Sequence, residues 1–388
     1  MHTAYKNALI FNSDTRRFEE GTLILKDGII EKITDLADDC ANIDDTVDVG
    51  GARIIPGLVD IHTHGRAGFD FTYADGDSLS VMLKSYAAAG TTSLMATFAS
   101  APISDYETAI DAVNIKRRNR SEGEAQIMGM HLEGRYINPL RRGAHATELL
   151  APPNNDELSG LTMRMLPLPI HVSCAPELEN GESFIRHAVS LGATVSLAHS
   201  DASYEQSLEA VSWGAVSFTH LYNAMRPILH RNPGNAVAAL MCDTACAELI
   251  CDGLHIAPPM IALASRAKPR DKVILITDSM EAAGCDDGQY SLAGTKVTVK
   301  DGLAINNEGN IAGSTLNLFT GMCNYAKFCS VPIEEAICAA TINPAKLVLG
   351  GNPDIGKLEK GKKADFIVLK NDTDCPQIKD VYIGGVKI

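Results

Sequence analysis

The sequence has no apolar run long enough to cross a membrane, and its first residues lack the apolar stretch of a secretory signal. It also has little positive charge: 34 basic residues stand against 48 acidic ones, a formal net charge of −14. Neither a basic stripe nor an aromatic RNA-binding signature is present. We therefore expect a cytoplasmic protein that binds neither membrane nor nucleic acid.

The ten cysteines include no CxxC pair and form no evenly spaced framework. Several of them, among them Cys242, Cys246 and Cys251, lie in apolar stretches where a thiol packs as a small hydrophobic group. We expect reduced, mostly structural cysteines. The 45% of hydrophobic and 21% of charged residues are typical of a globular protein, and 388 residues suffice for two domains or for a large barrel with an appendage.

Eight short runs of apolar and β-branched residues alternate with helical stretches, which is the pattern of parallel βαβ units. The runs begin near residues 52, 91, 125, 168, 193, 215, 246 and 272. Three intervening stretches, 77–90, 182–192 and 204–214, end in a glycine that is typical of a helix C-terminus. Eight such repeats predict a (β/α)8 barrel. A doubly wound open sheet is the alternative, but it would have fewer strands and a Gly-rich phosphate loop after the first.

The two ends of the chain consist of short strands joined by turns such as Lys26-Asp27-Gly28 and Gly384-Gly385. Neither end has enough strand length to bury a core alone, so we expect both to pair into one small β-sandwich beside the barrel. The predicted limits are 1–52 and 356–388 for the two parts of the sandwich and 53–355 for the barrel.

The stretch VDIHTHG places His62 and His64 one residue apart at the end of the first predicted barrel strand. Side chains at i and i+2 of a strand point to the same side, so both imidazoles can converge on one ion. The pair alone decides little, because histidines at this spacing are more often solvated or hydrogen-bonded than bound to a metal.

Further polar side chains fall at or just after the ends of predicted strands, which in such a barrel meet at the face that carries the active site. They are Glu133, His199, His220, His255 and Asp278. Imidazole and carboxylate ligands without a thiolate suit Zn²⁺, Fe²⁺, Co²⁺ or Mn²⁺, and an open coordination position lets such an ion activate water. The pattern therefore predicts a metal-dependent hydrolase.

A series of motifs along nearly the whole chain resembles the amidohydrolase superfamily and, within it, the N-acetylglucosamine-6-phosphate deacetylases. The motifs are PGLVDIHTHG, HLEG, RRGAH, LAHS, THLYNAMRP, HRNPG, DGLH, ITDSM, NPAK and GKLEKGKKADFIVL. HLEG, HLYNAM and TDSM are specific to the deacetylases, whereas HTHG and the C-terminal motif mark only the superfamily. The resemblance implies an enzyme that hydrolyses the N-acetyl group of N-acetylglucosamine 6-phosphate to glucosamine 6-phosphate and acetate.

The resemblance also implies one or two divalent metal ions per subunit. Glu133, His199 and His220 would hold the main ion, and His62 and His64 would hold a second, with Glu133 bridging. Zinc is the expected metal, and iron, cobalt or manganese are alternatives.

The remaining implied roles concern the chemistry and the sugar. Asp278, within reach of the second ion, would be the acid and base that takes a proton from the attacking water and delivers it to the departing amine. His145 would contact the sugar or the carbonyl oxygen and stabilise the oxyanion. His255 would contact the sugar or its phosphate.

The phosphate would be bound by Asn223, by the backbone N–H of Ala224 and by Arg231, which in similar proteins comes from the adjoining subunit. An arginine presents a planar fork of donors that suits a phosphate. The resemblance therefore implies a homodimer with shared active sites. Three more arginines in these motifs would add to the local positive charge: Arg141, Arg142 and Arg226.

Two positions depart from the family pattern: Arg135 stands where a proline usually follows HLEG, and Asn317 stands where GSTLNL usually has a threonine. They leave N-acetylgalactosamine 6-phosphate open as the alternative substrate. A non-catalytic assembly protein is a further alternative, but such proteins usually lose ligands and none is lost here. A dihydroorotase-like amidase or an isoaspartyl peptidase would carry a lysine at the fourth strand, and residues 170–177 contain none.

Overall fold

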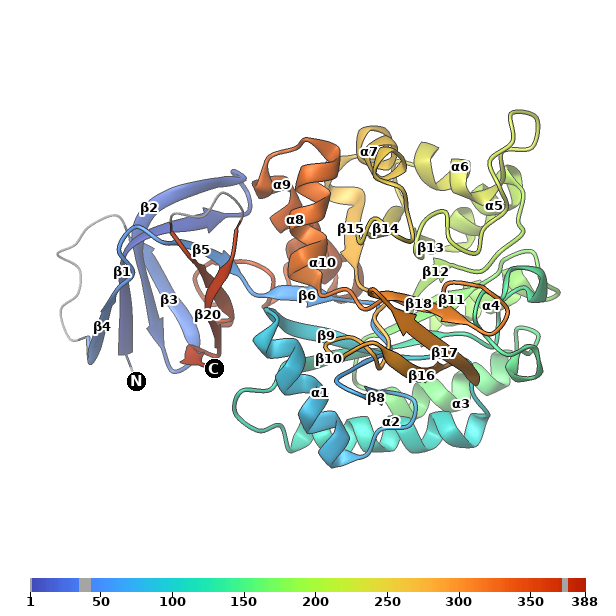
Figure 1. Cartoon of the computed structure of the whole chain (residues 1–388), viewed down its shortest axis with the longest axis horizontal. Helices are drawn as coiled ribbons and strands as arrows, with labels where there is room; N and C mark the ends of the chain where they lie inside the picture. The colour runs from blue at the N-terminus through green and yellow to red at the C-terminus, as the bar shows by residue number, and fades with distance from the viewer. Residues whose placement is uncertain (1, 35–42, 372–375) are drawn as a thin grey trace.

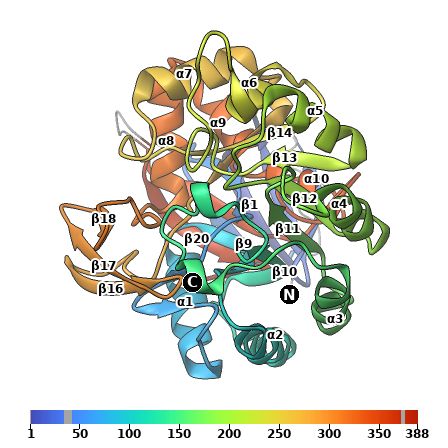
Figure 2. The same ribbon diagram turned by 90° about the vertical axis from the view of Figure 1, so that its right-hand side faces the viewer.

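The computed structural model describes residues 2–34, 43–371 and 376–388. Eight parallel strands form a nearly closed barrel in the order β15-β14-β13-β12-β11-β10-β9-β6, which confirms the predicted fold class. Figure 2 shows helices surrounding these strands. The strands are β6 (Leu58–Asp60), β9 (Thr91–Phe98), β10 (Gln126–Glu133), β11 (Ile170–Cys174), β12 (Thr194–Leu197), β13 (Ala215–Phe218), β14 (Cys246–Ile250) and β15 (Val273–Ile276).

The barrel strands contain apolar runs because they are covered by helices outside and by side chains inside; every residue of β9 and β11 is buried. The helices are α1 (Gly76–Ala88), α2 (Ile103–Arg118), α3 (Asn155–Met165), α4 (Gly181–Ser190), α5 (Tyr204–Trp213), α6 (Gly234–Met241), α7 (Pro258–Ala267), α8 (Leu318–Cys329), α9 (Ile333–Ala339) and α10 (Ile342–Leu349), with 3₁₀ turns η1 (Pro139–Arg141), η2 (Thr147–Leu149) and η3 (Arg270–Lys272). The glycine-ended helices of the prediction are α1, α4 and α5. Ser203 and Gln206 form a capping box at the start of α5, and Gly214 ends it.

Within the described ranges, no helix has the length and apolar character that a membrane span requires.

The segments that follow the first and last strands close the barrel at its carboxyl end. Thr63 and Ser279 form a parallel bridge, and the N–H of Asp278 donates to the carbonyl of His62 at 2.9 Å. Closure therefore places residues from opposite ends of the barrel sequence side by side.

Both ends of the chain build one mixed sheet of eight strands beside the barrel, as Figure 1 shows at its left. Its strands are β1 (His2–Asn12), β2 (Arg17–Lys26), β3 (Ile29–Thr34), β4 (Asp45–Asp48), β5 (Arg53–Pro56), β19 (Phe366–Leu369), β20 (Ile378–Ile383) and β21 (Val386–Lys387). Strand β1 pairs with β2 along one edge and with β4 and then β5 along the other. The rings of Tyr5, Phe366 and Tyr382 pack together in the core of this sheet. The predicted association of the two ends is therefore confirmed.

The first predicted barrel strand proves to be two strands that belong to different sheets. Strand β5 pairs within the terminal sheet, β6 begins the barrel, and Gly57 lies between them. A Cβ atom on Gly57 would lie 2.1 Å from Oγ1 of Thr92, so the close crossing of the two chains requires glycine. The domain limits at residues 52 and 355 stay a prediction. Strand β5 lies after residue 52 in the sequence but belongs to the terminal sheet.

A three-stranded antiparallel sheet after β15 was not predicted. It comprises β16 (Gly288–Leu292), β17 (Thr295–Lys300) and β18 (Leu303–Asn306) and lies at the side of the barrel mouth (Figure 2). We call it the mouth sheet. A two-stranded hairpin of β7 (Gly65–Arg66) and β8 (Phe69–Asp70) follows β6.

Candidate active site

A cavity of about 360 Å³ opens at the carboxyl end of the barrel strands. Most of the residues predicted from the sequence lie in its wall: His64, Glu133, His145, His199, His220, Asn223, Ala224, His255 and Asp278. His62 is fully buried against His64 and His220. The mouth sheet and the loop after it add Leu292, Asn310 and Ile311, which the sequence reasoning missed.

Three of these residues adopt a left-handed backbone conformation. His199, His220 and Asp278 each follow the end of a strand by two residues, and their φ angles are 46°, 32° and 50°. This conformation costs a residue other than glycine on the order of 1–3 kcal/mol, and it persists where the surrounding structure enforces it, often at functional sites. The strain turns these side chains into the mouth of the barrel.

Glu133, the last residue of β10, lies among the imidazoles of the site. Its Oε1 lies 3.0 Å from the Nε2 atoms of both His199 and His220, and these two nitrogens are 3.1 Å apart. We call these three residues the first group. The Oε2 of Glu133 lies 3.1 Å from Nε2 of His64 and 3.4 Å from Nε2 of His145. The carboxylate is thus placed to bridge two sets of nitrogen ligands.

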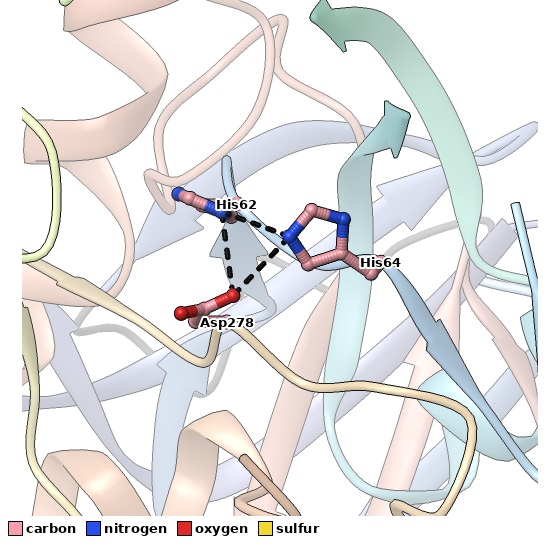
Figure 3. A group of neighbouring side chains, drawn as sticks. All are labelled: His62, His64 and Asp278. Atoms are coloured by element: carbon pink, nitrogen blue, oxygen red, sulfur yellow. Dashed lines mark hydrogen bonds and ion pairs between the residues drawn. The ribbon is translucent and has the colours of Figure 1, made fainter. Parts of the chain in front are cut away.

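His62, His64 and Asp278 form a second group, which Figure 3 shows. The Nε2 atoms of the two histidines are 3.3 Å apart. Oδ1 of Asp278 lies 3.4 Å from Nε2 of His62 and 3.3 Å from Nε2 of His64. Since His62 and His64 follow β6 and Asp278 follows β15, this group exists only in the closed barrel.

The donor atoms fit a divalent metal ion. The ligand atoms of the second group lie within 4.8 Å of one another, and so do those of Glu133, His145 and His199. Zinc–nitrogen bonds of about 2.0–2.1 Å in a tetrahedron separate neighbouring ligands by roughly 3.3 Å, close to the 3.1 and 3.3 Å between the facing nitrogens. Nitrogens that face each other at this distance need a proton or a cation between them. Nitrogen and oxygen donors without sulfur are suited to zinc and its neighbours.

Burial and the facing charges set the protonation of these groups. Burial opposes ionisation of Asp278, but the nearby His62 and His64 outweigh it and hold the pKa of Asp278 at about 2. Burial also opposes ionisation of Glu133, yet His62 and His145 contribute to a pKa well below its usual value. Conversely, Asp278 and Glu133 overcome burial and raise the pKa of His64 to about 9. Both carboxylates are therefore ionised.

The two remaining histidines of the cavity wall, His145 and His255, each form a hydrogen bond with a neighbouring side chain. Nδ1 of His145 lies 2.8 Å from Oγ of Ser100. Nδ1 of His255 lies 2.6 Å from Oδ2 of Asp252. Burial opposes ionisation of Asp252, but the hydrogen bond from His255 lowers its pKa below the usual value. These contacts fix the orientation of both rings at the cavity wall.

Acidic side chains pair with the arginines of the predicted positive cluster. Arg141 and Arg226 each approach Asp201 to 2.7 Å, and Arg142 pairs with Glu308. Of the three arginines, Arg141 lies in the cavity wall. Asp201 was missed, and its position directly after the LAHS motif was the available signal.

Both departures from the family pattern have structural explanations outside the cavity wall. Nε and Nη2 of Arg135 donate to the two carboxylate oxygens of Glu157 on α3, at 2.9 and 3.0 Å. Asn317 caps α8 by accepting the N–H of Thr320 at 2.8 Å, a role that threonine also fills. Neither departure therefore bears on the identity of the sugar through a direct contact with the cavity.

Arg231 lies outside the cavity of its own chain. It belongs to the exposed segment 227–232, which also presents Ile228 and Leu229 to solvent. A single chain therefore does not place Arg231 in the cavity wall beside Asn223 and Ala224.

Comparison with known proteins places the chain in a family. Residues 53–388 match the Amidohydrolase family. The chain is 36% identical over 328 residues to N-acetylglucosamine-6-phosphate deacetylase of Vibrio furnissii, with 84% of this chain and 82% of that one covered. It is 34% identical to N-acetylgalactosamine-6-phosphate deacetylase of Escherichia coli O157:H7, with 84% and 85% covered. The structure of a mutant N-acetyl-D-glucosamine-6-phosphate deacetylase from Mycobacterium smegmatis, in complex with N-acetyl-D-glucosamine-6-phosphate, superposes with a TM-score of 0.90 at 29% identity, covering 100% of this chain and 99% of that one. The chain thus belongs to the amidohydrolase family.

Proposed function

We propose that the protein hydrolyses the N-acetyl group of N-acetylglucosamine 6-phosphate and releases glucosamine 6-phosphate and acetate. The observation that carries this proposal is the convergence of histidines on both oxygens of Glu133, with Asp278 beside them, in the mouth of the barrel. The names of the relatives supply the class of substrate.

In this proposal the first group, Glu133, His199 and His220, would hold one divalent ion. His62 and His64 would hold a second ion together with Glu133, and zinc is the metal whose preferred ligands they match best. An ion bound at these groups supplies a Lewis acid that polarises a carbonyl and activates water at neutral pH.

Asp278 acts as the base and then as the acid. Its carboxylate is ionised, and it lines the cavity in which the amide would lie. It accepts a proton from the attacking water and returns it to the amine nitrogen as the C–N bond breaks, so that the carboxylate ends the cycle ionised. His145, whose ring is fixed by Ser100, stabilises the negative charge on the former carbonyl oxygen.

Asn223, the N–H of Ala224 and Arg231 of the partner subunit bind the phosphate, and His255 binds the sugar or its phosphate. We propose a homodimer for this reason. Support comes from the exposed position of the 227–232 segment, in which Ile228 and Leu229 offer apolar surface for a subunit contact.

We also propose that the enzyme acts in the cytoplasm. Seven cysteines in the described part of the chain have free thiols, which is in keeping with a reducing compartment: Cys174, Cys242, Cys246, Cys251, Cys285, Cys329 and Cys338.

N-acetylgalactosamine 6-phosphate is a second candidate substrate, because the relative from Escherichia coli O157:H7 that carries this name is nearly as similar. The test is acetate release from both phosphosugars side by side, with enzyme of measured metal content and an Asp278→Asn control. We expect release from the glucosamine compound that the control loses. Release from the galactosamine epimer alone would assign the enzyme to that sugar, and no release from either by metal-loaded enzyme would reject the proposal.

A mixing experiment tests the shared site. Arg231→Ala and Asp278→Asn chains should each be weakly active, but a hybrid dimer contains one site with both residues intact. If the chains exchange randomly, half of the dimers are hybrids, and about a quarter of wild-type activity should return. No recovery after demonstrated exchange of subunits would contradict a shared site.

A further inference from the structure

A buried acidic side chain next to the second group has no role in the chemistry described above. Glu248, on β14, has no exposed surface. Its Oε2 lies 3.9 Å from Nδ1 of His62. Its Oε1 lies 3.5 Å from Nε2 of His171 and 3.4 Å from the hydroxyl of Ser196. Glu248 thus contacts a proposed metal ligand on the ring edge that faces away from the ion.

His62 faces carboxylates with both of its ring nitrogens. Nε2 lies 3.4 Å from Asp278 and 3.7 Å from Glu133, and Nδ1 faces Glu248. Within the described residues, neither Nδ1 of His62 nor Oε2 of Glu248 has a hydrogen-bond partner, and each is the polar atom that the other faces. A carboxylate beside Nδ1 favours the tautomer that carries its proton there, which leaves the lone pair of Nε2 free for a cation.

The charge of Glu248 points to the same role. In the described ranges its ion pairs are with His62 and His171, and no lysine or arginine approaches it within an ion-pair distance. Its positive partners among the described residues are therefore histidine rings, which carry a charge only when they are protonated. A divalent cation at the second group would supply a permanent positive charge on the far side of His62.

The first group is supported differently. The ring nitrogen of His199 that faces away from Glu133 meets the backbone carbonyl of Arg141, at 2.8 Å. A neutral carbonyl orients the ring but adds no charge. The carboxylate of Glu248 therefore contacts a histidine of the second group, whereas His199 of the first group meets a neutral carbonyl.

We propose that Glu248 is a positioning residue that acts through His62 to strengthen cation binding at the second group. This inference rests on the two-ion site of the proposed function and names the residue that sets the affinity of its second ion. Outer carboxylates that orient a histidine ligand change metal affinity about 10–100-fold when they are replaced.

The test is a zinc titration of the metal-free wild-type and Glu248→Gln proteins, read by competition with a chromophoric chelator and by metal analysis. Wild-type protein should bind two ions per chain. Glu248→Gln keeps the shape and removes the charge, so the Kd of the first ion should change less than about threefold and that of the second should rise about 10–100-fold. Asp365→Asn removes another buried carboxylate, next to β19, and should bind both ions as the wild type does.

Wild-type affinity for the second ion in Glu248→Gln overturns the proposal, and so does an equal loss of both ions. A measurement on the wild type covers the case in which Glu248→Gln does not fold. In zinc-loaded protein with ¹⁵N-labelled histidine, the signal of His62, assigned through His62→Asn, should be that of the Nδ1–H tautomer. The Nε2–H tautomer overturns the proposal.

Acetate release by the wild type keeps this inference separate from the proposed function. If the wild type releases acetate and Glu248→Gln binds the second ion with wild-type affinity, only the proposed role of Glu248 is overturned. A single ion per wild-type chain at saturating zinc also overturns the inference and leaves deacetylation standing. Absence of acetate release with two bound ions rejects the proposed reaction, whereas the zinc titration still decides the role of Glu248.

Discussion

Replacing Arg135 with alanine should loosen the loop that follows Glu133 without altering the cavity wall. The guanidinium donates to both carboxylate oxygens of Glu157 and to the carbonyl of Ala101, at 3.2 Å. The two charged side chains are only 15% and 19% exposed. The hydroxyl of Tyr136 also donates to Glu157, at 2.8 Å. Removing Arg135 therefore leaves a largely buried carboxylate with one side-chain donor.

The expected loss of stability follows from these contacts. Hydrogen bonds to charged groups contribute about 1.5–3 kcal/mol, and a bidentate arginine pair lies in the upper part of that range, so we expect Arg135→Ala to lower the free energy of unfolding by about 2–3 kcal/mol. At about 2.1 cal/mol/K per residue, the unfolding entropy of a 388-residue chain is roughly 0.8 kcal/mol/K. The melting temperature should therefore fall by about 3 °C. Arg135→Lys should recover less than half of this loss, because an ammonium group cannot form both parallel bonds.

Calorimetry of the wild type, Arg135→Ala, Glu157→Ala and the double variant measures the coupling between the two side chains. Arg164→Ala is a matched control, since Arg164 is also on α3 and its side chain is 43% exposed in its ion pairs; it should change the melting temperature by less than about 1 °C. The KM of Arg135→Ala for the phosphosugar should stay within about twofold of the wild type. Additive effects of the two alanine substitutions would refute the reasoning. A large rise in KM at unchanged stability would show instead that Arg135 contacts the substrate.

Three further predictions concern single positions. Glu133→Gln should weaken zinc binding at both groups by more than the roughly 100-fold typical of an outer carboxylate; metal analysis after dialysis checks this, and two retained ions would contradict a bridging role. Gly57→Ala places a Cβ 2.1 Å from Oγ1 of Thr92 and should lower stability by about 1–3 kcal/mol or more in thermal denaturation, with partial recovery when Thr92→Ala is added; full stability of the single variant would contradict the close crossing. Asn317→Ala should cost about 1 kcal/mol and Asn317→Thr less than about 0.5 kcal/mol, because threonine also caps a helix; equal melting temperatures for the two variants would argue against the cap.

The barrel could be predicted because strands that are buried on both faces leave uninterrupted apolar runs in the sequence. The run at 53–60 misled the prediction, since its residues are equally apolar in the terminal sheet and in the barrel. What separates the two strands is the contact of Gly57 with Thr92, which is distant in sequence. The mouth sheet did leave local signals: β17 alternates exposed and buried residues, and Asp301-Gly302 has the positive φ angles of a hairpin turn.

The site residues could be located because barrel topology brings the ends of the strands together. The roles proposed for them remain predictions. Asp201 and Glu248 could not be found in this way. Asp201 joins two arginines from different loops, and those contacts depend on loop conformations that no sequence period encodes. Glu248 lies within the apolar run of β14, and its proposed role depends on its contact with the imidazole of His62 across the barrel.

The way the barrel closes also orders the steps in which the site can be assembled. The first group comes from the central strands β10, β12 and β13, which can associate before the ends of the barrel meet. The second group requires the contact between the segments after β6 and β15, where Thr63 bridges Ser279. Bringing such distant segments together carries a large loop-closure entropy and slows folding. An ion bound at the second group would therefore stabilise only the closed barrel by mass action, so the proposed second ion would favour closure over a partly assembled barrel.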